Sequence, residues 1–322
     1  MSLRVVDPGL YTTVQDEGRF GYGRFGVSRS GAMDLDSLRL ANRLAGNNRQ
    51  AAGLEMTATG VTIKAQRRCL LSLSGPGWSM YFDDGRVVKS PGAGHLDIGQ
   101  KIQVRRENEG VFRAYLAVRG GVDVPSVMGS RSTDSRAEFG GVDGKKLNGG
   151  EALPVGHQVS VEPVLGRVDK DIIPDPLRQL MDDQHTRKKR VRVILGPHED
   201  YFETDEIESF LNAEYKVSPN SNRVGYRLSG TPIYPHADSL LSEGVIPGAV
   251  QVPTGGKPIL LMADCQTMGG YPVICTVVSV DLNVVGRCAP GDVLEFSALS
   301  ADEAAQLRVE HQEAWETLQM QL

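Results

Sequence analysis

The sequence has little of what marks secreted, membrane or nucleic-acid-binding proteins. Its 322 residues include four cysteines and 6% aromatic residues, and the formal net charge is −5. The apolar runs all fall short of the ~20 residues that a bilayer-spanning helix needs, and the N-terminus lacks the apolar core of a signal peptide. A net negative chain has no electrostatic attraction for nucleic acid or for an anionic membrane surface. We therefore expect a cytoplasmic protein with neither kind of partner.

The cysteines and several missing signatures exclude further classes. Cys69, Cys265, Cys275 and Cys288 form no Cys-x-x-Cys pair and have no neighbouring histidines, which argues against a zinc site or a disulfide framework. A nucleophilic role for Cys265 would require a nearby base or a lowered pKa, which a sequence does not reveal. The chain has no phosphate-binding loop, no Gly-x-Ser-x-Gly elbow and no Met-Lys pair of the kind that carries biotin. We expect no metal and no covalently attached biotin on this chain.

The residue pattern predicts a mainly β fold with a few short helices. Glycine (37 residues) and proline (17 residues) are plentiful, and short β-branched runs alternate with turn signals, as in barrels and sandwiches. The charged, proline-containing segment 168–189 is typical of a linker. We therefore predict an N-terminal β-barrel domain at 1–167 and a C-terminal β-barrel domain with a terminal helix at 190–322.

A weak internal repeat supports two related halves. Residues 71–82 resemble 193–202, and residues 115–125 resemble 260–272, in the same order along the chain. Duplication of one β-barrel unit is the simplest explanation of this repeat.

The sequence predicts three helices from the capping residues at their ends. One begins at the N-cap candidate Asp34 and stops at Gly46, and a second begins near Thr204. A third begins with the capping box Ser300-Ala-Asp-Glu303 and runs towards the C-terminus.

The most informative stretch is residues 263–272, where a buried strand breaks and then resumes. Its polar and glycine residues are Asp264, Gln266, Thr267, Gly269 and Gly270. Polar groups buried without partners cost about 1–3 kcal/mol each, and glycines allow a ligand to approach the backbone. The stretch therefore predicts a ligand site. The alternative is a glycine bulge whose polar side chains bond to neighbouring loops.

Other candidates lie outside this stretch. Arg223, close to Tyr226, has the fork geometry that matches carboxylates and phosphates, although it could equally be an exposed arginine without a function. Gln251 would be close to Gln266 if their strands pair through the intervening turn. Asp34 stands at a helix start, where free N–H groups attract anions, or it simply caps the helix.

Seven motifs together resemble one known family, over nearly the whole chain. The motifs are Thr13-Val-Gln-Asp-x-Gly-Arg19, Gly26-Val-Ser-x-Ser-Gly-Ala-Met-Asp34, Ala41-Asn-x-Leu-x-Gly-Asn47, Ala117-Val-Arg-Gly-Gly121, Arg223-Val-Gly-Tyr-Arg-Leu228, Gly248-Ala-Val-Gln-Val-Pro253 and Asp264-x-Gln-Thr-x-Gly-Gly-Tyr-Pro272. They resemble the allophanate hydrolase subunit 2 family, also called the biotin-dependent carboxyltransferase or urea amidolyase-related family. This family includes the C-type subunit of bacterial 5-oxoprolinase and the sporulation regulator KipA.

The resemblance implies that the chain has two cyclophilin-like β-barrel domains and that it functions as part of a protein complex. The implied partners are an allophanate hydrolase subunit 1 (KipI)-like protein and a protein like the A-type subunit of 5-oxoprolinase. The first functional hypothesis is a subunit of an ATP-dependent hydrolase that opens 5-oxoproline to glutamate, with the ATP site not on this chain alone. The alternatives are the carboxyltransferase subunit of a biotin-dependent urea carboxylase and a KipA-type regulatory binding protein.

The first hypothesis assigns roles to individual residues. Gln251 and Gln266 would orient the amide, Asp264 would act as a base or bind the amide N–H, and Arg223 would pair with the substrate carboxylate. The catalytic candidates are Asp264, Gln266 and Tyr271, and the substrate-binding candidates are Gln251, Arg223, Tyr226, Gly269, Gly270 and Asp34. The chain has Arg287 where relatives commonly have glutamine, which would alter substrate choice if that position belongs to the site.

Overall fold

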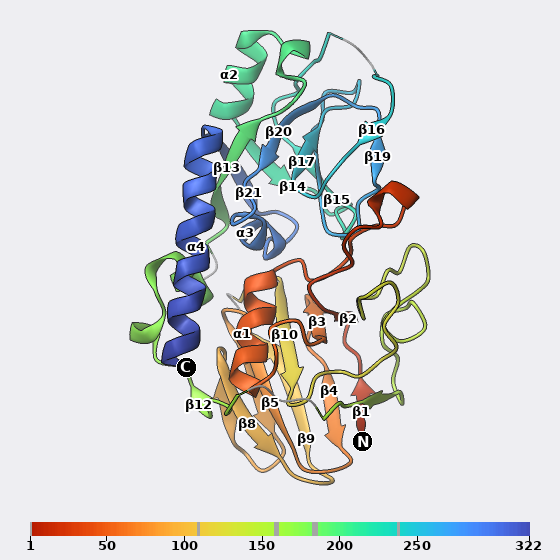
Figure 1. Cartoon of the computed structure of the whole chain (residues 1–322), viewed down its shortest axis with the longest axis vertical. Coiled ribbons are helices and arrows are strands. Elements are labelled where there is room, and N and C mark those ends of the chain that lie inside the picture. Colours follow the sequence, from red (N-terminus) through yellow and green to blue (C-terminus); the bar gives the residue numbers. More distant parts are fainter. Residues whose placement is uncertain (1, 108–109, 158–160, 182–185, 237–238) are drawn as a thin grey trace. The chain divides into compact units, whose positions relative to one another are not determined.

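The chain divides into two compact units. The computed structural model describes residues 2–107, 110–157, 161–181, 186–236 and 239–322 (Figure 1). The N-terminal unit comprises Met1–Arg19, Ser30–His185 and His311–Leu322, and the C-terminal unit comprises Phe20–Arg29 and Thr186–Glu310. Residues 182–185 of the predicted linker lie outside the described residues.

Twelve strands of the N-terminal unit form two six-stranded sheets. The first sheet has the order β11-β1-β4-β9-β6-β7 and the second has the order β12-β8-β5-β10-β3-β2. The strands of the first sheet are β1 (Ser2–Asp7), β4 (Thr62–Ala65), β6 (Trp78–Phe82), β7 (Val87–Lys89), β9 (Lys101–Arg106) and β11 (Ala152–Pro154). Those of the second are β2 (Tyr11–Gln15), β3 (Gly53–Thr57), β5 (Cys69–Ser74), β8 (Gly92–Leu96), β10 (Arg113–Val118) and β12 (Gly166–Arg167). Side chains of both sheets, among them Ile63, Trp78 and Leu116, share one hydrophobic core.

Helix α1 (Leu35–Ala45) packs against β5 and β10 of the second sheet. Asp34 caps its N-terminus, and Gly46 ends it in the left-handed conformation that glycine adopts readily. These are the ends that the sequence predicts.

A second apolar cluster explains why the end of the chain belongs to the N-terminal unit. Leu40 and Leu44 of α1 are buried in one cluster with Trp315 and Leu318, which lie on α4 (Ala301–Gln321). The cluster also includes Leu177 from the short helix η3 (Asp175–Leu180), which follows η2 (Lys170–Ile172). The described part of the predicted linker is therefore partly core. The N-terminal unit therefore includes described linker residues and the end of the chain, whereas Phe20–Arg29 belongs to the C-terminal unit, so the two units differ from the predicted domain bounds.

The C-terminal unit is a closed seven-stranded barrel. Its order is β13-β20-β17-β18-β15-β14-β21, and β13 and β21 close it as a parallel pair. The strands are β13 (Lys188–Leu195), β14 (Glu214–Val217), β15 (Gly225–Ser229), β17 (Ala249–Gln251), β18 (Ile259–Leu261), β20 (Val273–Val277) and β21 (Val293–Ala298). A separate two-stranded ribbon pairs β16 (Glu243–Gly244) with β19 (Met268–Gly269). The helical elements of this unit are η1 (Gly23–Phe25), η4 (Glu199–Tyr201), α2 (Thr204–Asn212), α3 (Leu282–Gly286) and the first part of α4, up to Glu310.

The mainly β prediction, with a few helices, is confirmed. The capping box at the start of α4 is present, since Ser300 N donates to Glu303 Oε2 at 2.8 Å and Glu303 N donates to Ser300 Oγ at 3.2 Å. The sequence repeat does not correspond to equivalent strand pairs. Strands β5 and β10 bond to each other, whereas the matching strands β13 and β18 are not neighbours in the barrel.

Candidate active site

The polar stretch predicted as a ligand site connects β18 to β20. The chain leaves the barrel after Leu261, adds β19 to the edge of β16, and re-enters the barrel at Val273. Because β19 pairs with β16 and not with a barrel strand, this part of the stretch lies outside the sheet of the barrel.

Arg223 and Asp264 form a buried ion pair. Arg223 Nε donates to Asp264 Oδ2 and Arg223 Nη2 donates to Asp264 Oδ1, each at 2.8 Å, and the two residues are 6% and 4% exposed. Asp264 N also donates to Arg223 O at 2.9 Å. A bidentate pair of this kind is a strong contact, and it fixes the loop to the residues just before β15. Neither side chain presents the free carboxylate or free guanidinium that the sequence-based roles require.

The structure brings Gln251 and Gln266 together. Gln266 Nε2 donates to Gln251 Oε1 at 3.3 Å, although the two residues are 15 positions apart. Gln251 is 2% exposed, and its Nε2 has no hydrogen-bond partner within the described part of the chain. A Cβ added to Gly269 would lie 2.5 Å from this nitrogen. Gly269 is therefore the residue that leaves room for the Gln251 amide.

A histidine–glutamate pair lies beside these residues and was not predicted from the sequence. His198 Nδ1 accepts a hydrogen bond from Val273 N at 3.1 Å, so its Nε2 carries the proton and faces Glu243 Oε1, also at 3.1 Å. Glu243 pairs with Gly269 in the β16–β19 ribbon. His198 is nearly buried and Glu243 is 46% exposed at its side chain, so the pair links the interior to solvent. The only feature of the sequence that could have indicated a role for His198 is the Gly-Pro-His sequence that follows strand β13.

The other candidates of the C-terminal unit have different surroundings. Tyr226 is buried on β15, with its hydroxyl 3.5 Å from Cys288 O, and Tyr271 is 42% exposed. Gly270 O accepts from Leu240 N at 2.7 Å. Burial raises the pKa of the Cys265 thiol to about 12, and Asp264 adds to the shift. The conditions that a nucleophilic Cys265 would need are therefore not met.

Asp34 and Arg287 are both buried. Asp34 belongs to the N-terminal unit, where its carboxylate accepts hydrogen bonds from Ser37 N at 3.1 Å and Ser37 Oγ at 2.5 Å. Arg287 follows α3 at the C-cap and is 4% exposed. The helix-capping interpretation of Asp34 is the one that its contacts support.

The N-terminal unit holds a buried polar cluster that the sequence did not reveal. Glu55 Oε2 accepts from Tyr115 Oη at 2.7 Å and from Met33 N at 2.9 Å, and Glu55 Oε1 lies 3.8 Å from Arg113 Nε. Burial, with the charge of Glu55, raises the pKa of Tyr115 well above its ordinary value. Glu55 sits in the middle of an apolar strand, and only strand register places it opposite Tyr115.

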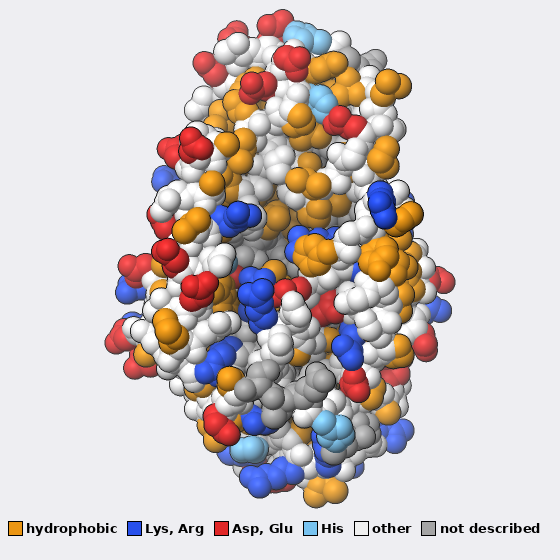
Figure 2. All heavy atoms as spheres, in the orientation of Figure 1, with side chains coloured by type: hydrophobic (Ala, Val, Ile, Leu, Met, Phe, Trp, Pro, Cys, Tyr) orange, Lys and Arg blue, Asp and Glu red, His pale blue; other side chains and the backbone are white. Residues whose placement is uncertain are grey.

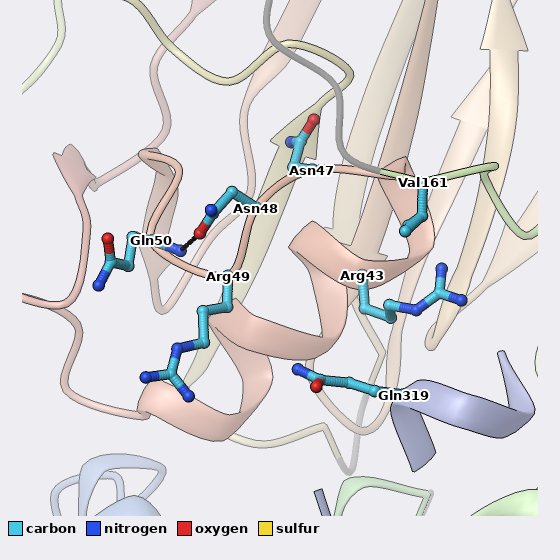
Figure 3. A pocket seen from close by; sticks show the side chains of 7 residues that line it. All are labelled: Arg43, Asn47, Asn48, Arg49, Gln50, Val161 and Gln319. Carbon is cyan, nitrogen blue, oxygen red and sulfur yellow. Dashed lines mark hydrogen bonds between the residues drawn. The ribbon is translucent and has the colours of Figure 1, made fainter. Parts of the chain in front are cut away.

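No group of side chains in the described residues has the composition of a metal site. None of the helices described is long and apolar enough to cross a membrane. One cavity of about 430 Å³ lies at the C-terminal end of α1, and Figure 3 shows its polar lining, including Arg43, Arg49 and Gln319. Arg43 and Arg49 point away from one another there, so this cavity presents no concentrated charge.

Comparison with known proteins identifies the family. The model described as "Carboxyltransferase domain, subdomain A and B" matches residues 25–298. The chain belongs to this family. It is 36% identical to the C-type subunit of 5-oxoprolinase from Escherichia coli (strain K12), over 99% of this chain and 98% of that protein. The resemblance inferred from the seven motifs is confirmed.

Members of this carboxyltransferase family also occur within longer proteins. The chain is 33% identical to the urea amidolyase of Lachancea kluyveri, over 99% of this chain and 18% of that protein. The crystal structure of the K. lactis urea amidolyase matches with a TM-score of 0.88 at 30% identity, over 98% of this chain and 20% of that one. The same fold is thus found both in a protein of this length and as a small part of much larger ones.

Proposed function

We propose that this chain is the C-type subunit of an ATP-dependent 5-oxoprolinase, a complex that opens the lactam of 5-oxoproline to give glutamate. The observation that carries the proposal is the end-to-end match with the C-type subunit of the Escherichia coli 5-oxoprolinase, which covers 98% of that protein. The urea amidolyases match at similar identity, but the chain spans only 18% of the Lachancea kluyveri protein. Because that relative is named as a subunit, we propose that this chain works with partner chains, namely a KipI-like protein and a protein like the A-type 5-oxoprolinase subunit.

The site residues fit recognition of an amide. Gln251 Nε2 is a buried donor with no partner in the described residues, and leaving such a donor unpaired costs about 1–3 kcal/mol. A lactam carbonyl oxygen is an acceptor that would offset this cost. Gln266 holds the Gln251 amide in orientation by bonding its oxygen, which directs the free N–H groups towards the ligand. We propose that these two glutamines bind the amide of the substrate.

We assign proton transfer to the pair formed by His198 and Glu243. His198 Nε2 and Glu243 Oε1 lie 3.1 Å apart, next to Gly269, and Glu243 reaches solvent. A histidine oriented by a second hydrogen bond at Nδ1 is suited to give or accept a proton during opening of the ring. We propose His198 for this step, and we propose that the Arg223–Asp264 pair positions the loop instead of reacting.

Tyr271 stays a candidate for contact with the substrate, because its side chain is partly exposed at the end of the same loop. The given sequence contains no phosphate-binding loop motif. ATP is accordingly assigned to the assembled complex, where it would supply the driving force for hydrolysis of a stable lactam.

The test is purification of the tagged chain from its native cells, followed by an assay for ATP hydrolysis that depends on 5-oxoproline. Activity together with a KipI-like partner would support the proposal. A partner with biotinylated protein and urea-dependent activity would replace it with the carboxyltransferase function, which the family model and the 0.88 TM-score to K. lactis urea amidolyase favour as the second candidate. A partner with neither activity would favour a regulatory binding protein.

A further inference from the structure

A second cavity of the N-terminal unit, of about 500 Å³, has a strongly basic lining. We call it the basic cavity. Its titratable lining residues are Arg67, Arg68, Cys69, His95, Arg119 and His157. No carboxylate is found in the lining among the described residues. On the face shown in Figure 2, acidic and basic side chains are interspersed, whereas the charged side chains that line this cavity are all basic.

Strand register gathers these residues from distant parts of the sequence. Leu70 on β5 pairs with His95 on β8, and its carbonyl oxygen accepts from Arg119 N, just beyond β10, at 2.9 Å. His95 and Arg119 therefore flank Leu70 on its two sides. Arg67 and Arg68 come from the turn that joins β4 to β5, directly before this row.

Much of the positive charge in the basic cavity is not neutralised. Arg67 is half-buried and has no hydrogen-bond or ion-pair partner in the described part of the chain. Arg68 Nε lies 3.2 Å from Asp97 Oδ1, but both side chains are mainly exposed, and exposed pairs of this kind are worth at most about 1 kcal/mol. The Arg119 side chain bonds to the carbonyl oxygens of Ala45 and Val161, each at 3.4 Å. Within the described ranges, its positive charge has no carboxylate counterpart.

The Cys69 thiol does not repel an anion from the basic cavity, because it carries no negative charge. Burial raises the pKa of its thiol to about 11, while the neighbouring Arg67 acts in the opposite direction. The thiol is therefore neutral at physiological pH.

One wall of the basic cavity is built from two glycines in close contact. A Cβ added to Gly120 would lie 2.1 Å from Gly156 O, so neither position has room for a side chain. Gly120 N donates to Asn47 Oδ1 at 2.8 Å, and Asn47 Nδ2 donates to Val118 O at 2.8 Å. Two motifs noted in the sequence, 41–47 and 117–121, thus contact each other here. Their hydrogen bonds fix the backbone on both sides of Arg119.

We propose that the basic cavity binds the phosphate groups of a small organic phosphate of nucleotide size. Guanidinium groups match phosphate oxygens in two-point geometry, and three of them line this cavity. The volume lies within the range of about 300–1,000 Å³ that is typical of small-molecule sites, which exceeds the need of a single phosphate ion. The assignment is independent of the 5-oxoprolinase proposal, since it concerns other residues in the other unit.

The test is isothermal titration calorimetry of the whole chain, at constant ionic strength, with pyrophosphate, ATP and adenosine as probes. Pyrophosphate and ATP should bind saturably, and adenosine should not. The double variant Arg67→Gln, Arg68→Gln should lose at least about tenfold in affinity for both phosphates, since it removes two charge-assisted contacts. Both residues lie in a turn outside the apolar clusters, and circular dichroism of the variant would confirm its fold.

Arg49→Gln is the matched control. Arg49 lines the cavity of Figure 3, is more than half exposed, and lies 3.9 Å from Glu17. Its loss removes the same kind of charge from the same unit without touching the basic cavity, so the affinity should not change. The proposal is overturned by absence of saturable phosphate binding to the wild type, by unchanged affinity in the double variant, or by an equal loss with Arg49→Gln. Adenosine binding as tightly as ATP would also overturn it, because the base would then be the recognised group.

Discussion

The carboxylate of Asp264 receives two hydrogen bonds of 2.8 Å from the guanidinium of Arg223, and both side chains are almost completely buried. Removal of one partner from a buried pair leaves an uncompensated charge, which typically costs about 3–5 kcal/mol. Arg223→Met should therefore lower the free energy of unfolding of the isolated chain by about that amount, as measured by urea denaturation.

Arg227→Met is the control for this change, because Arg227 is a nearby arginine that is exposed on β15. Its effect should stay within about 0.5 kcal/mol. Equal stability of the two variants would mean that the Arg223–Asp264 pair does not hold the loop.

Gly269→Ala tests the space that the Gln251 amide occupies. The added methyl group would stand 2.5 Å from Gln251 Nε2, so the amide has to turn away from the site. The complex should lose at least about tenfold in kcat/KM for 5-oxoproline while the chain stays folded. Gly255→Ala serves as the control, since a Cβ there has no heavy atom within 4 Å, and it should keep full activity. Wild-type kinetics for both variants would remove Gly269 and Gln251 from the site.

His198→Asn separates proton transfer from structure. The amide oxygen of asparagine can replace Nδ1 as the acceptor for Val273 N, but no group replaces the proton at Nε2. We expect turnover of the complex to fall by about 10²-fold and stability to change by no more than about 1 kcal/mol. The control is His236→Asn, whose ring lies 3.6 Å from Glu203 on the surface of the same unit. Similar turnover of the two variants would contradict the role of His198.

Cys265 should affect the pH dependence of stability and not the reaction. Burial raises the pKa of its thiol from 9.0 to about 12, so the folded state favours the neutral form. This contribution to stability is fully present below pH 9 and is lost as the pH rises towards 12. Cys265→Ala should therefore lose less stability than the wild type above pH 9, by up to about 1.4 kcal/mol per pH unit.

Urea denaturation at several pH values under reducing conditions measures this difference. Other groups titrate equally in both proteins, so the gap between the two curves reports on Cys265. Parallel curves would contradict the effect of burial on this thiol, and a large loss of turnover in the variant would restore Cys265 as a nucleophile.

Local patterns in the sequence were sufficient for the mainly β class, for the ends of α1 and for one pair of candidate site residues. The ends of α1 depend on Asp34 and Gly46, which act through their own backbone neighbourhoods, and the prediction of this helix is confirmed. The contact between Gln251 and Gln266 follows from antiparallel pairing of β17 with β18 across a short turn. In both cases the residues that interact are close to each other in the sequence.

Contacts between residues that are far apart in the sequence could not be predicted in this way. The sequence shows that Asp264 and Arg223 are polar, but their 41-residue separation hides that they neutralise each other. His198 reaches Glu243 only through the pairing of strands that lie far apart. The basic cavity combines residues between 67 and 157, so no local run of charge marks it.

The most direct test of the proposed amide site compares Gln251→Met with the wild type in the assembled complex. Methionine keeps the volume of the side chain and removes the buried N–H donor, which has no partner in the described part of the protein. We predict that the wild-type complex hydrolyses ATP in response to 5-oxoproline and forms glutamate. The variant should show a loss of at least about tenfold with little change in stability. A wild-type complex that responds to urea instead, or a variant with unchanged turnover of 5-oxoproline, would contradict this function for the site.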